Sequence, residues 1–173
     1  MTISTRSTPT PRKSNTFRCL AFDPGFERLG VAIVERADGR EVLLHSDCIR
    51  TPKTLPFARR LEILGEAAER LIDEYEPSAV ALEDVYFAKN EKTAMKIARV
   101  AGMLAYIATK NGLTLFEYTP MQVKVAITGW GKGDKKAIAA MVPRLIALPN
   151  KKRLDDELDA IAVGLTCLAS TKL

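Results

Sequence analysis

The chain has 173 residues, 47% of them hydrophobic, and its mean hydropathy is close to zero at −0.03. This length can bury one full hydrophobic core but is short for two domains. A net charge of +5, from 26 Lys and Arg against 21 Asp and Glu, mildly favours a polyanionic partner. No apolar run is long enough to span a bilayer, so we expect no membrane association.

The cysteines exclude two common kinds of site. Cys19, Cys48 and Cys167 are odd in number and lack any C-x-x-C spacing, so neither a disulfide framework nor a zinc site is indicated. We therefore expect a reducing, cytoplasmic environment for this protein.

The first 16 residues differ in composition from the rest of the chain. Residues 1–16 are rich in Ser, Thr and Pro, include three basic residues and carry no acid. This composition predicts a flexible basic N-terminal arm, followed by a single globular domain over residues 17–173. A targeting segment is the alternative, because acid-poor, Ser-rich stretches are also typical of organellar leaders.

Residues 20–35, with the sequence LAFDPGFERLGVAIVE, predict two strands joined by a short link. Pro24 and Gly25 end the first strand, because Pro lacks the N–H that a strand ladder needs and Gly permits turn dihedrals. Asp23 is thereby fixed at the end of a buried strand. A simple turn-initiating role is the alternative for Asp23. A third antiparallel strand is expected over residues 41–49, where His45 is expected to be a surface or packing residue.

The middle of the chain alternates between helix and strand. Apolar residues at three-and-four spacing predict a helix over residues 55–75, and AVALE at 79–83 predicts a buried parallel strand that ends in Glu83. Glu83 is thus carried to the edge of a sheet, unless it is merely an exposed acid at a strand end. A helix over 90–111 carries a stripe of small residues that suits core packing or a second subunit. A strand over 113–118 and a helix over 119–128 follow.

The segment GWGKGDKK at residues 129–136 is glycine-rich and basic, and it opens a helix at Asp134. It lacks the spacing of a phosphate-binding fingerprint and follows a helix instead of a strand. Four lysines gather in and near it: Lys124, Lys132, Lys135 and Lys136. A solvated basic face is the alternative to a binding site. We expect Trp130 to anchor the loop to the core, with stacking on a base as the alternative.

The last predicted helix, over residues 155–169, carries Asp156 and Asp159 on one face because they are three residues apart. Stabilisation of first-turn acids by the helix dipole is one explanation. Asp159, however, lies in an apolar stretch where an isolated charge is costly unless it is compensated. Hard divalent cations such as Mg²⁺ take oxygen ligands. Together with Asp23 and Glu83, these acids can hold two ions for phosphodiester hydrolysis, if the elements that carry them converge.

These motifs resemble the RNase H-like nucleases and, more narrowly, the crossover junction endodeoxyribonuclease RuvC family. The matching segments run in the family's order from Cys19 to Cys167: FDPGFERLG, ALEDVYFAKNEKTAMKIA, LFEYTPMQVK, GKGDKKAIAAMV and DDELDAIAVG. The expected fold is α/β and RNase H-like. It has a five-stranded mixed sheet, with three antiparallel strands and then two parallel ones, and helices on both faces.

The resemblance also implies roles for individual residues. It makes four residues the catalytic, metal-binding acids: Asp23, Glu83, Asp156 and Asp159. They would hold two Mg²⁺ ions, for which Mn²⁺ can substitute. The resemblance assigns DNA-backbone contacts to Lys124 and Lys135, with Lys132 and Lys136 beside them, and insertion at the junction centre to Tyr86. The loop from Phe26 to Leu29 and the residue Ala101 depart from the family pattern.

The function that the resemblance implies is resolution of four-way Holliday junctions by paired symmetric nicks, in recombination and repair. A homodimer would act, with the RuvA and RuvB branch-migration complex as partner. Two alternatives are a branched-DNA binding module that does not cut, and a related RNase H-like nuclease that acts on RNA. An actin-like ATPase is a third, but it needs two such domains and this chain is short for that.

Overall fold

The structure is a computed structural model, and it describes residues 16–84, 91–131 and 135–171. Across these ranges a five-stranded sheet has the order β3-β2-β1-β4-β5. Its strands are β1 (Thr16–Asp23), β2 (Arg28–Ala37), β3 (Arg40–Arg50), β4 (Ala79–Glu83) and β5 (Thr114–Tyr118). The helices are α1 (Phe57–Tyr75), α2 (Glu91–Lys110), α3 (Pro120–Thr128), α4 (Lys135–Leu145) and α5 (Asp155–Ser170).

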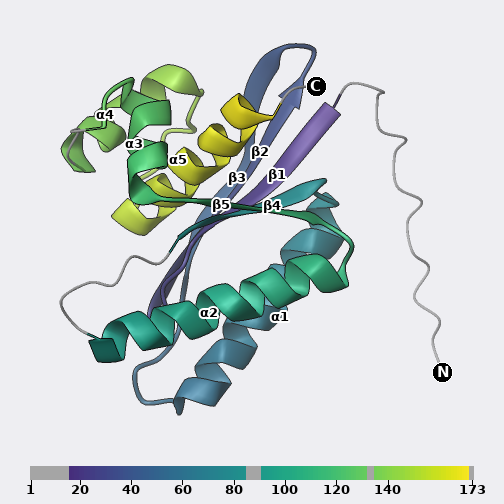
Figure 1. The fold of residues 1–173 in the computed structure, drawn as a ribbon, viewed down its shortest axis with the longest axis vertical. Coiled ribbons are helices and arrows are strands. Elements are labelled where there is room, and N and C mark those ends of the chain that lie inside the picture. The colour runs from purple at the N-terminus through teal and green to yellow at the C-terminus, as the bar shows by residue number, and fades with distance from the viewer. Residues whose placement is uncertain (1–15, 85–90, 132–134, 172–173) are drawn as a thin grey trace.

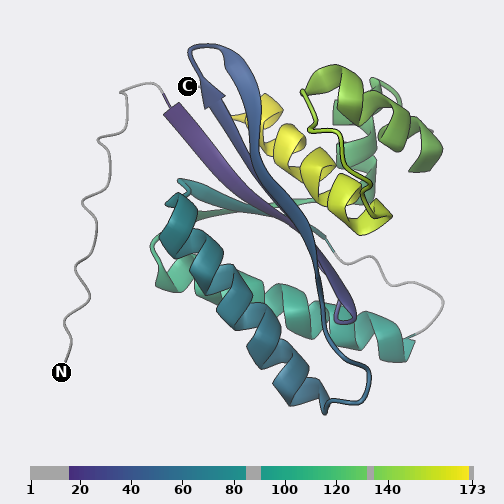
Figure 2. The ribbon, with the colours of Figure 1, turned by 180° about the vertical axis from the view of Figure 1, so that it is seen from behind.

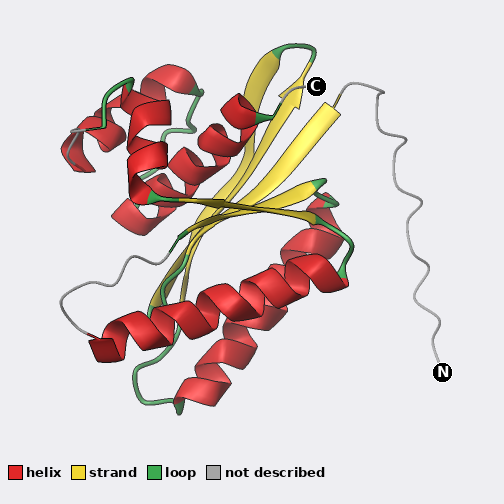
Figure 3. Ribbon diagram, in the orientation of Figure 1, coloured by secondary structure: helices red, strands yellow, loops and turns green. Residues whose placement is uncertain are grey.

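Two helical layers enclose the sheet. Helices α1 and α2 cover one face, while α5, with α3 and α4 outside it, covers the other (Figure 1; seen from behind in Figure 2). The three layers are plain when the ribbon is coloured by secondary structure (Figure 3). Strand β1 pairs antiparallel with β2 and β2 with β3, whereas β1 pairs parallel with β4 and β4 with β5. The predicted three antiparallel and two parallel strands, with helices on both faces, are confirmed.

The central strand β1 is buried on both faces, as its apolar sequence predicts. Successive side chains alternate between the layers. Cys19 and Ala21 belong to the core on the α5 side, whereas Leu20 and Phe22 belong to the core under α1 and α2. On the α5 side a Cβ added to Gly164 would lie 2.8 Å from a Val34 methyl, so the helix approaches the sheet closely there.

Most element bounds agree with the sequence prediction to within two residues. Helix α1 begins at Phe57 because Pro56 occupies its N-cap position. The start of α3 has the expected cap, in which the Thr119 hydroxyl accepts a hydrogen bond from the Gln122 N–H. The small residues expected to form one stripe on α2 do not all face the core, because Ala94 is buried whereas Gly102 is exposed.

The structure also tests what the sequence predicts for His45, the cysteines and the start of the first strand. The His45 ring packs against Tyr75 with 5.5 Å between the ring centroids, which is the packing role expected. All three cysteines are free. Thr16, expected as the last residue of the basic arm, is the first residue of β1, and the rest of that arm lies outside the described residues. Among the described helices, none has the length and apolar character of a membrane span.

Candidate active site

Two acids meet at the carboxyl edge of the sheet. Strand β1 ends at Asp23 because Pro24 follows it. The parallel register pairs Phe22 with Leu82, so the next residues along the two strands, Asp23 and Glu83, are neighbours at the strand ends. Strand pairing alone therefore brings together two of the acids that the sequence indicates.

Helix α5 brings its first turns over this edge. Gly30, which pairs with Asp23 in the β1–β2 ladder, lies so near α5 that an added Cβ would clash with the Asp156 carbonyl oxygen. Glycine is needed at this position because a side chain would push the helix away. Asp156 and Asp159 on α5 are thus held above the ends of β1 and β4.

The electrostatics of Asp23 show that the three other acids lie close enough to act on it. Burial, followed by the charges of Asp159, Glu83 and Asp156 in that order, raises the pKa of Asp23 from 3.8 to about 7. Burial and the charge of Asp159 also raise the pKa of Glu83. The ends of β1 and β4 and the first turns of α5, which carry these acids, therefore lie close together.

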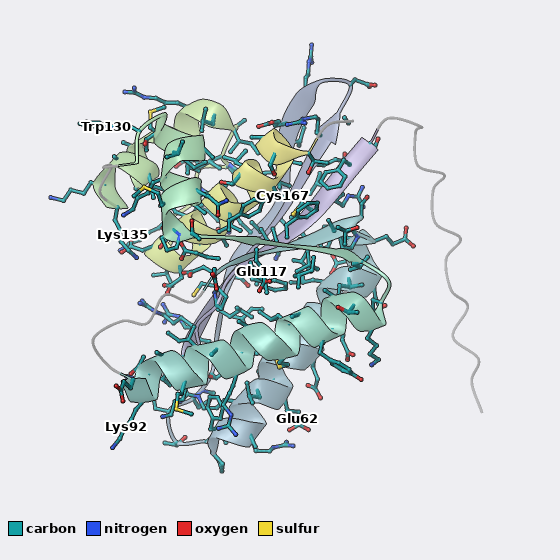
Figure 4. The ribbon with its side chains drawn as sticks, in the orientation of Figure 1. Glu62, Lys92, Glu117, Trp130, Lys135 and Cys167 are labelled. Atoms are coloured by element: carbon teal, nitrogen blue, oxygen red, sulfur yellow. The ribbon has the colours of Figure 1, made fainter. Side chains whose placement is uncertain are left out.

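Basic side chains flank the acids. Lys135 Nζ on α4 lies 3.1 Å from Asp159 Oδ2, and its charge lowers the pKa of both Asp23 and Glu83. Lys124 on α3 also lowers the pKa of Glu83, so it lies close enough to act on the site. Figure 4 shows Lys135 in the helical lobe beside α5.

The other residues that the sequence predicts to contact DNA, and Trp130 beside them, lie in different environments. Lys136 is exposed on α4, next to Lys135. Tyr86 and Lys132 lie outside the described residues. Trp130 is 66% exposed, so the expectation that its ring anchors the loop to the core is wrong. The helical turn that ends α3 presents the indole to solvent.

Sequence reasoning missed two residues at this site. Arg28 Nε lies 3.2 Å from Asp156 Oδ2, from the first position of β2. Glu157 is buried and accepts a 2.6 Å hydrogen bond from the Ser46 hydroxyl. Arg28 stands in the FDPGFERLG segment and Glu157 in DDELD, so both lie inside the motifs that resemble the family. Sequence spacing gives no sign of their partners.

The loop after Asp23, where the sequence departs from the family pattern, is anchored by a cationic and aromatic cluster. The Thr51 hydroxyl donates to the Phe26 carbonyl at 2.6 Å and accepts from Arg60 Nε at 2.8 Å. The Arg60 guanidinium and the Lys96 ammonium lie 4.9 and 5.0 Å from the Phe26 ring centroid. Phe26 therefore fixes the loop that holds Asp23 in place.

The donor chemistry fits divalent cations. Four carboxylates supply hard oxygen ligands, and their mutual repulsion is the kind that a cation relieves. Asp156 Oδ2 is buried and accepts no hydrogen bond from the described residues, although Arg28 is near. The described residues form no group of three acid, His or Cys side chains around one point, and Asp156 and Asp159 instead pair with Arg28 and Lys135.

Comparison with known proteins supports a family assignment. The family model described as "Crossover junction endodeoxyribonuclease RuvC" matches residues 19–167. A RuvC of Leifsonia xyli is 40% identical over 151 residues, covering 87% of this chain and 73% of the relative. A RuvC of Thermosipho melanesiensis is 38% identical, covering 88% of this chain and 96% of the relative.

Solved structures agree with this similarity. The structure of T. thermophilus RuvC in complex with a Holliday junction substrate has a TM-score of 0.80 and 29% sequence identity, and covers 87% of this chain and 92% of that one. The yeast mitochondrial resolvase Ydc2 shares the fold, with a TM-score of 0.63 at 10% identity over 87% of this chain and 78% of that one. From its motifs, its sheet and these matches, the chain belongs to the crossover junction endodeoxyribonuclease RuvC family.

Proposed function

We propose that this protein is a Holliday junction resolvase, a structure-selective DNA endonuclease that nicks two opposed strands of a four-way junction. The observation that carries the proposal is the position of four acids at one edge of the sheet, where the charges of Glu83, Asp156 and Asp159 raise the pKa of Asp23. A cluster of partly buried carboxylates is costly on its own. It is suited to binding the divalent cations that phosphodiester hydrolysis uses.

The four acids are the proposed ligands of two Mg²⁺ ions, for which Mn²⁺ can substitute. Bound there, the ions would activate water and stabilise the charge that develops on the phosphodiester. No side-chain nucleophile is then required. Asp23 and Glu83 are fixed by the sheet and Asp156 and Asp159 by α5, so all four carboxylates would be held in place before substrate arrives.

Lysines at the rim of the site would position the DNA. Lys135 pairs with Asp159, and both Lys135 and Lys124 lower the pKa of Glu83, which supports a role for these two lysines in binding the phosphate that is cleaved. Lys136, Lys132 and Tyr86 are further proposed contacts of the junction. Because such contacts neutralise phosphates, binding should weaken steeply with salt.

A homodimer fits the substrate, whose two opposed strands require two active sites related by symmetry. Met95, Gly102 and Tyr106 are exposed on α2 and lie on one helical face, where a second copy of α2 could approach. We further propose that the RuvA and RuvB branch-migration complex is a partner. A cytoplasmic location suits the three free cysteines.

A cleavage assay tests the proposal. A labelled four-way junction, a linear duplex of the same sequence and an RNA–DNA hybrid are each incubated with the protein in Mg²⁺ or in EDTA. The variants are Asp159→Asn and, as a matched control, Asp155→Asn, because Asp155 is an exposed acid on the same helix. We expect paired nicks in the junction alone, only with Mg²⁺, that Asp159→Asn abolishes and Asp155→Asn leaves intact.

Other outcomes favour the alternatives. Tight junction binding by the native protein and by Asp159→Asn, with no nicks in either, would indicate a binding module that does not cut. Cleavage of the RNA strand of the hybrid, with the junction left whole, would indicate a nuclease that acts on RNA. Either result overturns the resolvase proposal.

A further inference from the structure

Trp130 is the protein's single tryptophan, and its ring is 66% exposed. Two other apolar side chains are exposed close to it on α3, Met121 at 58% and Val125 at 46%. The backbone after Trp130 lies against this pair, since a Cβ added to Gly131 would clash with Met121 Sδ and lie 3.4 Å from Val125 Cγ2. The exposed apolar side chains of Trp130 and of Met121 and Val125, against which the turn after Trp130 packs, are here called the Trp130 platform.

The turn that carries Trp130 is held by its own hydrogen bonds. Gly129 has a φ of 71° and its N–H donates to the Val125 carbonyl at 2.9 Å, which ends α3 in a left-handed cap. The Thr128 hydroxyl accepts from the Trp130 N–H at 3.2 Å and lies 2.7 Å from the Trp130 carbonyl oxygen. The backbone that carries the indole is therefore already ordered, so binding of a ligand does not have to order it.

Lysines are present on the two helices that flank Trp130 in the chain. Lys124 is on α3, and Lys135 begins α4, where it pairs with Asp159. Both lysines act electrostatically on Glu83, so the helices that carry the platform also border the acid cluster. Trp130 and Lys135 are seen in the same helical lobe in Figure 4.

We propose that the Trp130 platform binds an unstacked nucleobase of the junction DNA, with the indole stacking on the base and the neighbouring lysines holding the adjoining phosphates. The inference rests on the proposed function and extends it to a substrate contact. Three side chains form too small an apolar patch for a stable protein interface, which needs roughly 800 Å² from each partner. An aromatic ring beside lysines is the arrangement that single-stranded nucleic acid sites use.

The base must be one that has left the duplex, because a base stacked between its neighbours offers no free face to an indole. Continuous base stacking is interrupted at the strand-exchange point of a four-way junction, so a base is more easily unstacked there than within a linear duplex. Trp130 should therefore add little to the affinity of the protein for a linear duplex of the same sequence. The platform would thus add to the protein's selectivity for branched DNA over linear DNA.

Because the protein has one tryptophan, its intrinsic fluorescence reports on Trp130 directly. The native protein in EDTA is titrated at fixed salt with four-way junction, linear duplex and a single-stranded oligonucleotide. Stacking on a base should quench the emission with junction and single strand, and much less with duplex. Dissociation constants for the junction are then measured by anisotropy of labelled DNA for the native protein and for Trp130→Phe, Trp130→Leu and Trp130→Ala.

We expect Trp130→Ala and Trp130→Leu to bind the junction about 5- to 100-fold more weakly, the range for loss of one stacked base. Trp130→Phe should keep much of the affinity, because it keeps an aromatic face. Trp130→Leu separates stacking from simple apolar contact. Since the ring is exposed, each variant should unfold at the native temperature, which a thermal melt checks.

Two negative results are distinguishable. If the native protein binds and nicks the junction, but emission does not change and Trp130→Ala binds equally well, the Trp130 inference is overturned and the proposed function stands. If the native protein neither binds nor nicks the junction, the proposed function itself fails, and the inference fails with it. Equal quenching by duplex and junction would refute selectivity for an unstacked base.

Discussion

The Ser46 hydroxyl on the edge strand β3 donates a 2.6 Å hydrogen bond to Glu157, the residue that follows Asp156 on α5. The same carboxylate lies 2.8 Å from Lys151 Nζ and 3.2 Å from Arg153 Nε, and the Glu157 and Arg153 side chains are both buried. Lys151 Nζ also donates to the Ser46 carbonyl at 2.7 Å. This network ties the start of α5, and hence two of the four acids, to the sheet.

Glu157→Ala should therefore weaken both the fold and the site. Removing one partner of a buried ion pair leaves the other charge uncompensated, which costs about 3 to 5 kcal/mol of unfolding free energy. Glu157→Gln should cost less, because its amide oxygen still accepts from Ser46. Urea unfolding measures both variants, with Glu69→Ala at an exposed pair on α1 as control. A Glu157→Ala protein as stable as the control would contradict this role.

Asp23 should make the metal-free protein less stable as pH rises. Its folded pKa of about 7 is above the usual 3.8, so the folded state binds the proton more tightly than the unfolded state does. The stabilisation of the folded state by this tighter proton binding is complete below about pH 4, and it is lost as the pH rises through about 7. The difference of about three units between the folded pKa and the usual pKa of Asp23 corresponds to a loss of at most about 4 kcal/mol of unfolding free energy. Unfolding in EDTA at pH 5 and pH 8 measures this loss.

Asp23→Asn is the matched variant for that experiment, because the amide has a similar shape and does not titrate. In EDTA at pH 8 it should be more stable than the native protein, whereas at pH 5 the difference should be small. Mg²⁺ should stabilise the native protein at pH 8 and have little effect on Asp23→Asn. A native protein whose stability in EDTA is the same at both pH values would show that burial and the neighbouring acids do not raise the Asp23 pKa.

The sheet and the acids could be predicted because local patterns encode them. Pro24 ends a buried strand after Asp23, AVALE ends in Glu83, and spacing by three puts Asp156 and Asp159 on one helix face. Each of these features is visible within a few residues of sequence. The position of the acid cluster then follows from which strands pair in parallel.

The pairs made by Glu157 and Arg28 could not be predicted, because their partners are distant in the sequence. Ser46 and Glu157 are 111 residues apart, and only the packing of α5 on the sheet brings them together. The exposure of Trp130 escapes prediction for another reason. A tryptophan between glycines is compatible with a buried or an exposed ring, and the local sequence does not distinguish the two.

Lys135→Met should slow cleavage far more than it weakens junction binding. Lys135 is the cation paired with Asp159, and removing one electrostatic donor from an active site typically costs about 100-fold in rate or more. Lys135 lowers the pKa of Asp23, so removing the lysine should raise that pKa. The pH at which the cleavage rate increases should then be higher in Lys135→Met than in the native protein. Single-turnover rates across pH measure both effects. Lys110→Met, which removes an exposed ion pair on α2, is the control and should match the native profile.

Gly102→Glu should separate the proposed dimer without harming the fold of each copy. An added Cβ at Gly102 meets no atom within 4 Å, and replacing glycine within a helix generally raises its stability. Two copies of α2 packed through this face would instead bury two carboxylates against each other. Sedimentation should then show a monomer, with the paired nicks replaced by slow, unpaired ones. Leu44→Glu adds the same charge at an exposed apolar position on β3 and should leave the dimer whole. If Gly102→Glu stays dimeric, the subunits meet through a different surface.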